Sequence, residues 1–155
     1  MKTLVGIETK SANIIIDNLN DLLANFQIHY QNLRGLHWNI KGKNFFELHV
    51  KFEEYYTDSQ LKIDEIAERI LTLGGTPLHT FTDYLEVSKI GVGKNITNDV
   101  EAVNLVVKGY KQLLEIEREL LVVSDEADDE GTNAMISDFV SEQEKTLWML
   151  NAWLG

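Results

Sequence analysis

The sequence has no cysteine and only one proline among its 155 residues. The absence of cysteine excludes disulfide bridges and thiolate metal sites, because both need its sulfur. The scarcity of proline leaves room for long, uninterrupted helices. No apolar run approaches the ~18 residues of a membrane-spanning helix, and the opening MKTLVGIETK lacks the features of a signal peptide. We therefore expect a cytoplasmic protein.

Positive charge is also scarce in the chain. Fourteen Lys and Arg residues stand against 25 Asp and Glu, which gives a net charge of -11. A chain this acidic repels the phosphates of nucleic acids and attracts cations. Hydrophobic residues make up 44% of the chain and charged residues 25%, the balance of a globular protein. Length and composition predict a single domain over residues 1–155.

Apolar residues recur at steps of three and four along four long segments, as they do in amphipathic helices. The predicted helices cover residues 11–37, residues 44–73, a segment that begins after Thr97, and a segment that runs from Thr132 toward the C-terminus. Ser11 and Thr132 are the predicted N-caps of the first and last helices, because a side-chain hydroxyl can accept a hydrogen bond from an unpaired N–H group there.

A long connection over residues 78–97 follows the helix-stop signal formed by Gly74, Gly75 and Pro77. Residues 80–88 are predicted to form a short helix within it. Such a connection travels the length of a bundle and makes the second and third long helices parallel. Since no segment alternates like a strand, the sequence predicts an all-α fold, a ferritin-like four-helix bundle with a short helix in the crossover.

A polar stripe accompanies the apolar face of the second predicted helix. Its members, three or four residues apart, are His49, Glu53, Tyr56, Gln60, Asp64 and Glu68. Charged stripes are usually solvated faces. However, His49 with Glu53 and Asp64 with Glu68 form two pairs at i,i+4 spacing, and such groups bind iron, manganese and zinc. The stripe alone leaves both interpretations open.

The two pairs cannot bind one metal ion within a single chain, because His49 and Asp64 lie about 22 Å apart along a helix axis. The chain also lacks the Glu-x-x-His motif of di-iron bundles. Two copies of the helix that cross antiparallel near residues 58 and 59 would solve this problem. His49 would then face the partner's Glu68, and Glu53 would face the partner's Asp64, because both pairs of residue numbers have the same sum. The spacing predicts two equivalent sites, each shared between subunits.

The segment HWNIKGKNFFELHVKFEEYYTDSQLKIDEIAERILTLGGTP (residues 37–77) and the ending WMLNAWLG resemble the Dps mini-ferritins, a family named for DNA protection in starved cells. The resemblance covers essentially the whole chain. Its most specific feature is a pair of histidines twelve residues apart, with carboxylates four, fifteen and nineteen positions after the second. The resemblance implies a dodecamer around a hollow core, with ferroxidase sites between two-fold-related subunits.

The iron ligands implied by this resemblance come from both subunits: His37, His49 and Glu53 from one, Asp64 and Glu68 from the other. Glu53 stands where the family often has Asp, so the charge is kept on a longer side chain. Trp38 matches a family tryptophan that resembles a sink for oxidising equivalents. The implied reaction is oxidation of Fe(II), preferably by hydrogen peroxide, with storage of the Fe(III) mineral. Zinc would also fit the resting site.

The acidic stretch SDEADDEG, residues 124–131, is predicted to be the loop between the third and fourth long helices. By itself it could be an ordinary solvated loop. In the family, acids near the start of the last helix line three-fold channels for iron entry. The resemblance therefore implies pore positions at Asp125 and Glu130, with Asp129 as a further candidate.

Three functions are compatible with the sequence: a ferroxidase and iron-storage cage, a nucleoid-binding protein that protects DNA with little iron role, and a plain helical oligomer. The N-terminus offers only Lys2 and Lys10 as basic residues, and the net charge of -11 opposes contact with phosphates. We expect a homo-oligomer, with Fe(II) and hydrogen peroxide as substrates, that binds neither DNA nor membranes.

Overall fold

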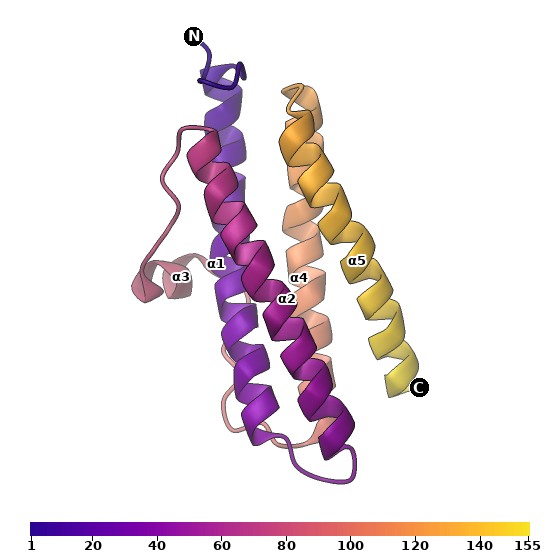
Figure 1. Ribbon diagram of the computed structural model, residues 1–155. Helices are drawn as coiled ribbons and strands as arrows, with labels where there is room; N and C mark the ends of the chain where they lie inside the picture. The colour runs from indigo at the N-terminus through magenta and orange to yellow at the C-terminus, as the bar shows by residue number, and fades with distance from the viewer.

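The computed structural model describes all of residues 1–155. Its helices are α1 (Thr9–Asn39), α2 (Phe45–Thr72), α3 (Phe81–Val87), α4 (Asp99–Glu126) and α5 (Glu130–Leu154). The four long helices form one bundle, and α3 lies outside it against α1 (Figure 1). The predicted all-α fold, with a short helix in the crossover, is confirmed. No helix combines the length and the apolar character needed to cross a membrane.

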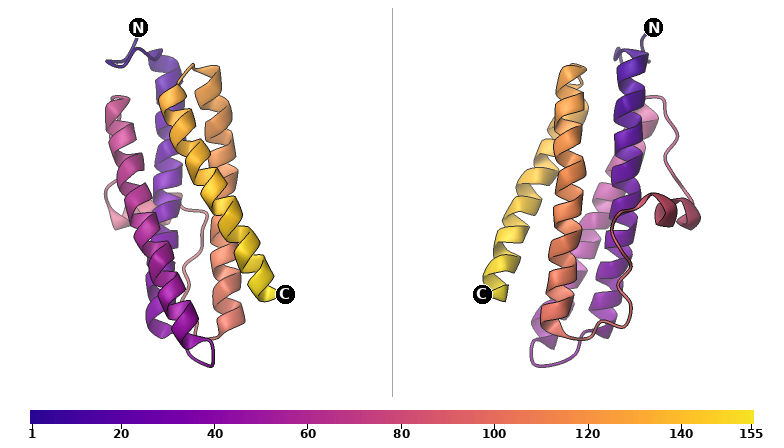
Figure 2. Two further views of the ribbon diagram at one scale, coloured as in Figure 1. Left: turned by 45° about the vertical axis from the view of Figure 1, so that its right-hand side comes forward. Right: turned by 180° about the vertical axis from the view of Figure 1, so that it is seen from behind.

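The course of the chain makes α2 and α4 parallel, as the long crossover predicts. α1 and α2 form one antiparallel pair, and α4 and α5 form the other (Figure 2). Residues 73–98 connect the end of α2 to the start of α4 at the opposite end of the bundle. This connection runs along the outside of the bundle and contains α3 (Figure 1). Two antiparallel pairs joined by one long crossover define the ferritin-like bundle.

Two buried asparagines of α1 hold the crossover in place. The side-chain oxygen of Asn25 accepts hydrogen bonds from the N–H groups of residues 89–90 at 3.0 and 3.2 Å. Asn32 accepts a hydrogen bond from the N–H of Gly93 at 2.8 Å and donates one to the carbonyl of Gly91 at 2.9 Å. Because irregular backbone lacks partners of its own, these side chains satisfy it and fix its path across α1.

The core follows the apolar stripes of α1 and α2 closely, but on α4 the prediction is only partly right. The expected stripe was Val100, Val103, Val107, Tyr110, Leu114 and Leu121, and only Val103, Tyr110 and Leu114 of these are buried. Val100 is half exposed and Val107 only partly buried, whereas Val106 and Leu113 are buried. The apolar arc of α4 is wide enough to fit either register, and contact with α1 and α5 selects the buried one.

The first helix begins at Thr9, so the predicted Ser11 cap is wrong. The N-terminal segment folds back on itself, with Lys2 bridged to Glu8. The carbonyl of Met1 accepts hydrogen bonds from the N–H and the hydroxyl of Thr9, both at 2.9 Å. A backbone acceptor takes the place of a capping side chain, and Ser11 lies inside the helix.

The acidic stretch 124–131 is mostly helical, contrary to the predicted loop. Only residues 127–129 separate α4 from α5. The cap of α5 is Asp129 rather than Thr132, because the Asp129 carboxylate accepts a hydrogen bond from the N–H of Thr132 at 3.1 Å. Thr132 lies one turn inside the helix and donates its own hydroxyl to the same carboxylate.

A buried pair of polar side chains links α4 and α5 in the bundle interior. Gln143 Nε2 donates a hydrogen bond to Glu117 Oε1 at 2.9 Å, while Glu117 Oε2 and Gln143 Oε1 have no partner. Burial raises the pKa of the Glu117 carboxyl to about 8, against the opposing effects of Gln143, Lys62 and Arg118. A proton on Oε2 would make it a donor, and the unpartnered Gln143 Oε1 is an acceptor. We infer that Glu117 is neutral below about pH 8.

Stability should therefore fall as the pH rises from the ordinary carboxyl pKa of 4.5 toward about 8, because the folded chain holds a proton that the unfolded chain releases. The loss is on the order of a few kcal/mol per subunit. Glu117→Gln, which keeps an uncharged donor and acceptor, should lessen this pH dependence. Thermal unfolding of both proteins at several pH values measures it. Identical pH profiles would show that Glu117 is not protonated in the folded chain.

Candidate metal centre

A tight turn between α1 and α2 brings His37 and His49 together. α1 continues to Asn39, two residues beyond the predicted end, and only residues 40–44 separate it from α2. Gly42 has φ 109°, a left-handed conformation that glycine adopts without steric cost. His37 therefore lies in the last turn of α1 and His49 in the second turn of α2, facing each other.

The two histidines hold each other through reciprocal hydrogen bonds. His37 Nδ1 lies 2.6 Å from the carbonyl oxygen of His49, and His49 Nδ1 lies 2.7 Å from the carbonyl oxygen of His37. Because a carbonyl only accepts, each Nδ1 carries the proton, and each Nε2 keeps a free lone pair. The rings stack with centroids 3.8 Å apart, and Phe45 stacks on His49 at 4.9 Å. This tautomer and fixed orientation are those of metal-binding histidines.

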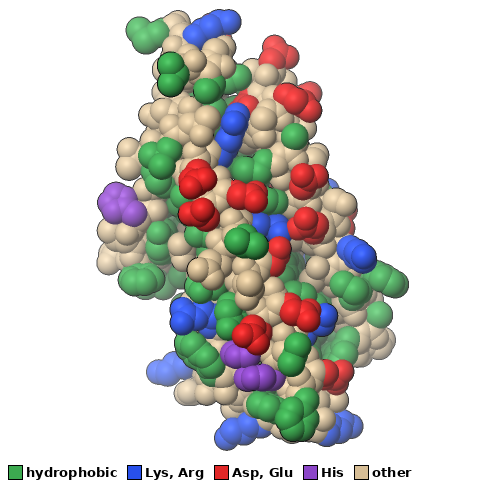
Figure 3. All heavy atoms as spheres, viewed as in Figure 1, with side chains coloured by type: hydrophobic (Ala, Val, Ile, Leu, Met, Phe, Trp, Pro, Cys, Tyr) green, Lys and Arg blue, Asp and Glu red, His purple; other side chains and the backbone are tan.

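The carboxylates of the site lie on the exposed face of α2. Glu53 is exposed one turn after His49, and the Tyr56 hydroxyl donates a hydrogen bond to Glu53 Oε1 at 3.4 Å. Asp64 and Glu68 are exposed farther along the same helix. Figure 3 shows acidic and apolar side chains mixed over this face of the bundle.

A single chain brings together no group of three potential metal ligands among its His, Asp and Glu side chains. The structure does bring His37 and His49 into contact, with Glu53 on the next turn of α2. It leaves Asp64 and Glu68 well separated from them on the same helix. Each chain thus carries a histidine wall, defined as His37, His49 and Glu53, and a carboxylate wall, defined as Asp64 and Glu68.

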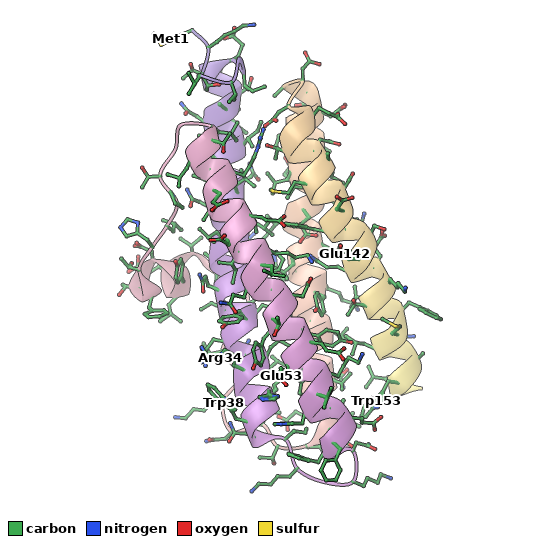
Figure 4. All side chains as sticks on the ribbon, in the orientation of Figure 1. Met1, Arg34, Trp38, Glu53, Glu142 and Trp153 are labelled. Carbon is green, nitrogen blue, oxygen red and sulfur yellow. The ribbon has the colours of Figure 1, made fainter.

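Trp38 lies beside the histidine wall but points outward. Its side chain is 57% exposed, and the Arg34 guanidinium lies over its ring at 4.9 Å (Figure 4). Tyr56 instead packs edge-on against His37, with ring centroids 5.4 Å apart. The sequence places Tyr56 in the polar stripe but does not connect it with the histidines. Its spacing of three residues from Glu53 was the signal of a closer connection with the site.

The three acids proposed for a pore differ in their surroundings. Asp125 and Glu130 are exposed at the end of the bundle where α4 meets α5. The Asp129 side chain is only 1% exposed, and its Oδ1 lies 2.6 Å from an Arg69 nitrogen. Arg69 also donates a hydrogen bond to Thr132 at 2.8 Å. Asp129 therefore joins α2 to α5, and of the three candidates only Asp125 and Glu130 present free carboxylates at the surface.

Comparison with known proteins shows the family of the fold. The profile of the ferritin-like domain matches residues 16–155. A Dps crystal structure from Vibrio cholerae is 49% identical, with a TM-score of 0.98, over 99% of this chain and 97% of that one. A DNA protection during starvation protein of Porphyromonas gingivalis is 39% identical over 97% of this chain and 94% of its own length.

These matches define first a class, the ferritin-like proteins, whose Vibrio cholerae member is described as belonging to a broad superfamily of diiron-carboxylate proteins. Within that class, the chain belongs to the Dps family. Membership supports a role in iron binding, iron storage and protection.

Asp129→Ala should lower the free energy of unfolding by roughly 2–4 kcal/mol, because it removes a helix cap and leaves Arg69 without its buried partner. Asp125→Ala is the matched control, since the Asp125 side chain is exposed and makes no ion pair. Thermal or denaturant unfolding compares them. Equal stability of the two variants would contradict the structural role of Asp129.

Proposed function

We propose that the protein is a ferroxidase of the Dps type, which oxidises Fe(II), preferably with hydrogen peroxide, and stores the Fe(III) mineral in a hollow dodecamer. The observation that carries the proposal is the histidine wall, whose two Nε2 lone pairs are free and fixed in place. Imidazole and carboxylate ligands hold Fe(II), and the carboxylate charges stabilise Fe(III). Two Fe(II) supply the two electrons that reduce one hydrogen peroxide to water.

Each site is shared between two subunits that cross along α2. In the antiparallel register, the histidine wall of one subunit faces the carboxylate wall of the other. The same register pairs exposed apolar residues of α2, since Phe46 would face the partner's Leu71, and Leu61 would face the partner's Tyr56. Phe46 is 83% exposed and Leu61 64% exposed in the single chain, which leaves apolar surface that this contact would bury. Apolar packing and ligand pairing thus favour one register.

Two structures of Listeria innocua Dps are relevant to the proposed ligands. One, 26% identical with a TM-score of 0.88, carries glycine in place of two histidines that are twelve residues apart, as His37 and His49 are here. The other, 28% identical with a TM-score of 0.87, was soaked with zinc. Zinc also binds imidazole and carboxylate ligands, so zinc would fit the resting site of this protein too.

The proposed cage has twelve subunits and acts in the cytoplasm. We do not extend the function to DNA binding, which the name of the Porphyromonas gingivalis relative suggests for that protein. The net charge of -11 per subunit makes the phosphate contribution to DNA affinity unfavourable. A tight, salt-sensitive shift of DNA by the intact protein would favour the nucleoid-binding alternative.

The shared site predicts complementation between two inactive variants. His49→Ala alters the histidine wall and Asp64→Ala the carboxylate wall, so each variant alone should lose most peroxide-driven Fe(II) oxidation. Reassembly of an equal mixture should restore about a quarter of the wild-type rate, because half of the random pairs are mixed and each mixed pair has one intact site. Stopped-flow absorbance measures the rate.

Each variant unfolded and reassembled alone is the control, and mass spectrometry of the mixed particles confirms subunit exchange. No recovery in particles that contain both variants would place both walls of a site in one chain. No oxidation by the wild-type protein would instead contradict the ferroxidase proposal as a whole.

Iron entry through a channel lined by Asp125 and Glu130 predicts a different phenotype. Asp125→Asn with Glu130→Gln should slow Fe(II) uptake, because fixed negative charge steers cations into a narrow channel. The ligands stay intact, so oxidation at saturating Fe(II) should recover. The dependence of the initial rate on Fe(II) concentration separates entry from chemistry. Uptake at the wild-type rate at low Fe(II) would exclude this entry route.

A further inference from the structure

A hollow of about 460 Å³ lies between the crossover and α4, on the side of the bundle away from α2 (Figure 2). Its lining includes Lys89 of the crossover and Lys108 and Lys111 of α4. All three lysines are exposed, and none of them forms an ion pair. The chain has only 14 basic residues and a net charge of -11, so three unpaired lysines around one hollow reverse the sign of charge locally.

Backbone donors of the crossover line the same hollow. The N–H groups of Gly91 and Val92 have no acceptor in the chain, whereas the N–H groups on either side of them are bonded to α1 side chains. Consecutive N–H groups without partners form a concave surface that attracts anions, and the ammonium groups beside them strengthen this attraction. Glu115 is the one acid of the lining, so the hollow keeps an excess of two positive charges.

No hydrogen bond joins this part of the crossover to α4. The side-chain hydrogen bonds of residues 89–93 run to α1 or to Ser88, and no backbone hydrogen bond connects these residues with α4. Across the hollow, the charge of Lys89 is opposed by the like charges of the two α4 lysines. An anion between them would remove this repulsion and would connect the crossover to α4.

We propose that this hollow binds a small phosphate anion, such as inorganic phosphate or pyrophosphate. A phosphate group carries more than one negative charge at neutral pH and has several acceptor oxygens, which suit three ammonium groups and two free N–H groups. The same positive charge repels Fe(II), so the hollow is not a further iron site. The proposal goes beyond the ferroxidase function and does not depend on it, because it uses no residue of the histidine wall or the carboxylate wall.

The arrangement of the lysines favours a small anion over a nucleic acid. A DNA duplex presents one phosphate charge about every 1.7 Å along its axis, so it is held by a row of contacts rather than by one cluster. The three lysines lie around a single hollow, and the net charge of -11 repels the rest of a duplex. A small phosphate anion needs only the hollow itself.

The test is calorimetric titration of the intact, iron-free protein with pyrophosphate and, separately, with inorganic phosphate. We expect one anion to bind per subunit, with an affinity that falls as sodium chloride is added, because the lysines are exposed to screening by salt. Each anion should also raise the midpoint of thermal unfolding at constant ionic strength, since only the folded chain forms the hollow. Failure of both anions to bind the wild-type protein would overturn the proposal.

Two double variants locate the binding. Lys108→Gln with Lys111→Gln should weaken pyrophosphate binding by about tenfold or more, because each change removes a charged hydrogen-bond donor. Lys10→Gln with Lys145→Gln is the matched control, since both lysines are exposed, lie outside the hollow and change the net charge equally. Circular dichroism verifies that both variants fold. Equal affinity of the two double variants for pyrophosphate would overturn the proposal, because the overall charge and not the hollow would then govern binding.

A short DNA duplex, titrated under the same conditions, separates a free phosphate anion from the phosphates of a nucleic acid. We expect the duplex not to bind and not to compete with pyrophosphate. Duplex binding that is lost in the variant with Lys108→Gln and Lys111→Gln, together with no binding of pyrophosphate, would overturn the proposal in favour of a nucleic-acid surface.

Discussion

The long crossover between α2 and α4 is the constraint on which the directions of the four long helices and the exposure of α2 depend. Its backbone has no regular partners, and it keeps its path because Asn25 and Asn32 of α1 satisfy the polar groups of residues 89–93. A connection of this length makes α2 and α4 parallel and places α3 outside the bundle. The outer face of α2, with its acids and apolar residues, is then left uncovered by the chain itself. The proposed shared site therefore has its origin in the topology.

The short turn between α1 and α2 fixes the two rings of the histidine wall with their Nε2 atoms free to bind metal. Neither histidine has a protein partner for Nε2, yet both are fixed, because each ring donates its Nδ1 proton to the other's backbone carbonyl. The carbonyl of His37 belongs to the last turn of α1, where helix carbonyls lack intrahelical partners. The hydrogen bond from His49 Nδ1 thus satisfies a carbonyl at the end of α1 and at the same time fixes the metal-binding tautomer of His49. Tyr56 and Glu53 extend this arrangement along α2, because Tyr56 packs against His37 and donates a hydrogen bond to Glu53.

Acidic residues follow two different rules in this chain. Inside the bundle, each is neutralised: Glu117 by a raised pKa of about 8, and Asp129 by Arg69. The buried Lys62 ammonium is also paired with opposite charge. Burial alone would lower the pKa of Lys62, but its hydrogen bonds to Asp58 and Glu142 raise it. On the surface, the carboxylates of Asp64 and Glu68 on α2, and of Asp125 and Glu130 at the α4–α5 end, are exposed and remain free to meet a cation. Burial therefore separates structural acids from those available for iron.

The sequence by itself determined the helices, the parallel crossover and the family, because apolar periodicity, stop signals and a spaced set of ligands are local patterns. It also indicated that Asp64 and Glu68 lie too far from His49 to share one metal ion within a chain. Only the tertiary structure decided that Met1 and Asp129, rather than Ser11 and Thr132, satisfy the helix starts. The tertiary structure also paired Asp129 with Arg69, stacked His37 on His49 and brought Tyr56 against His37. These contacts join residues from different helices, and no local pattern encodes them, because they depend on how the helices pack.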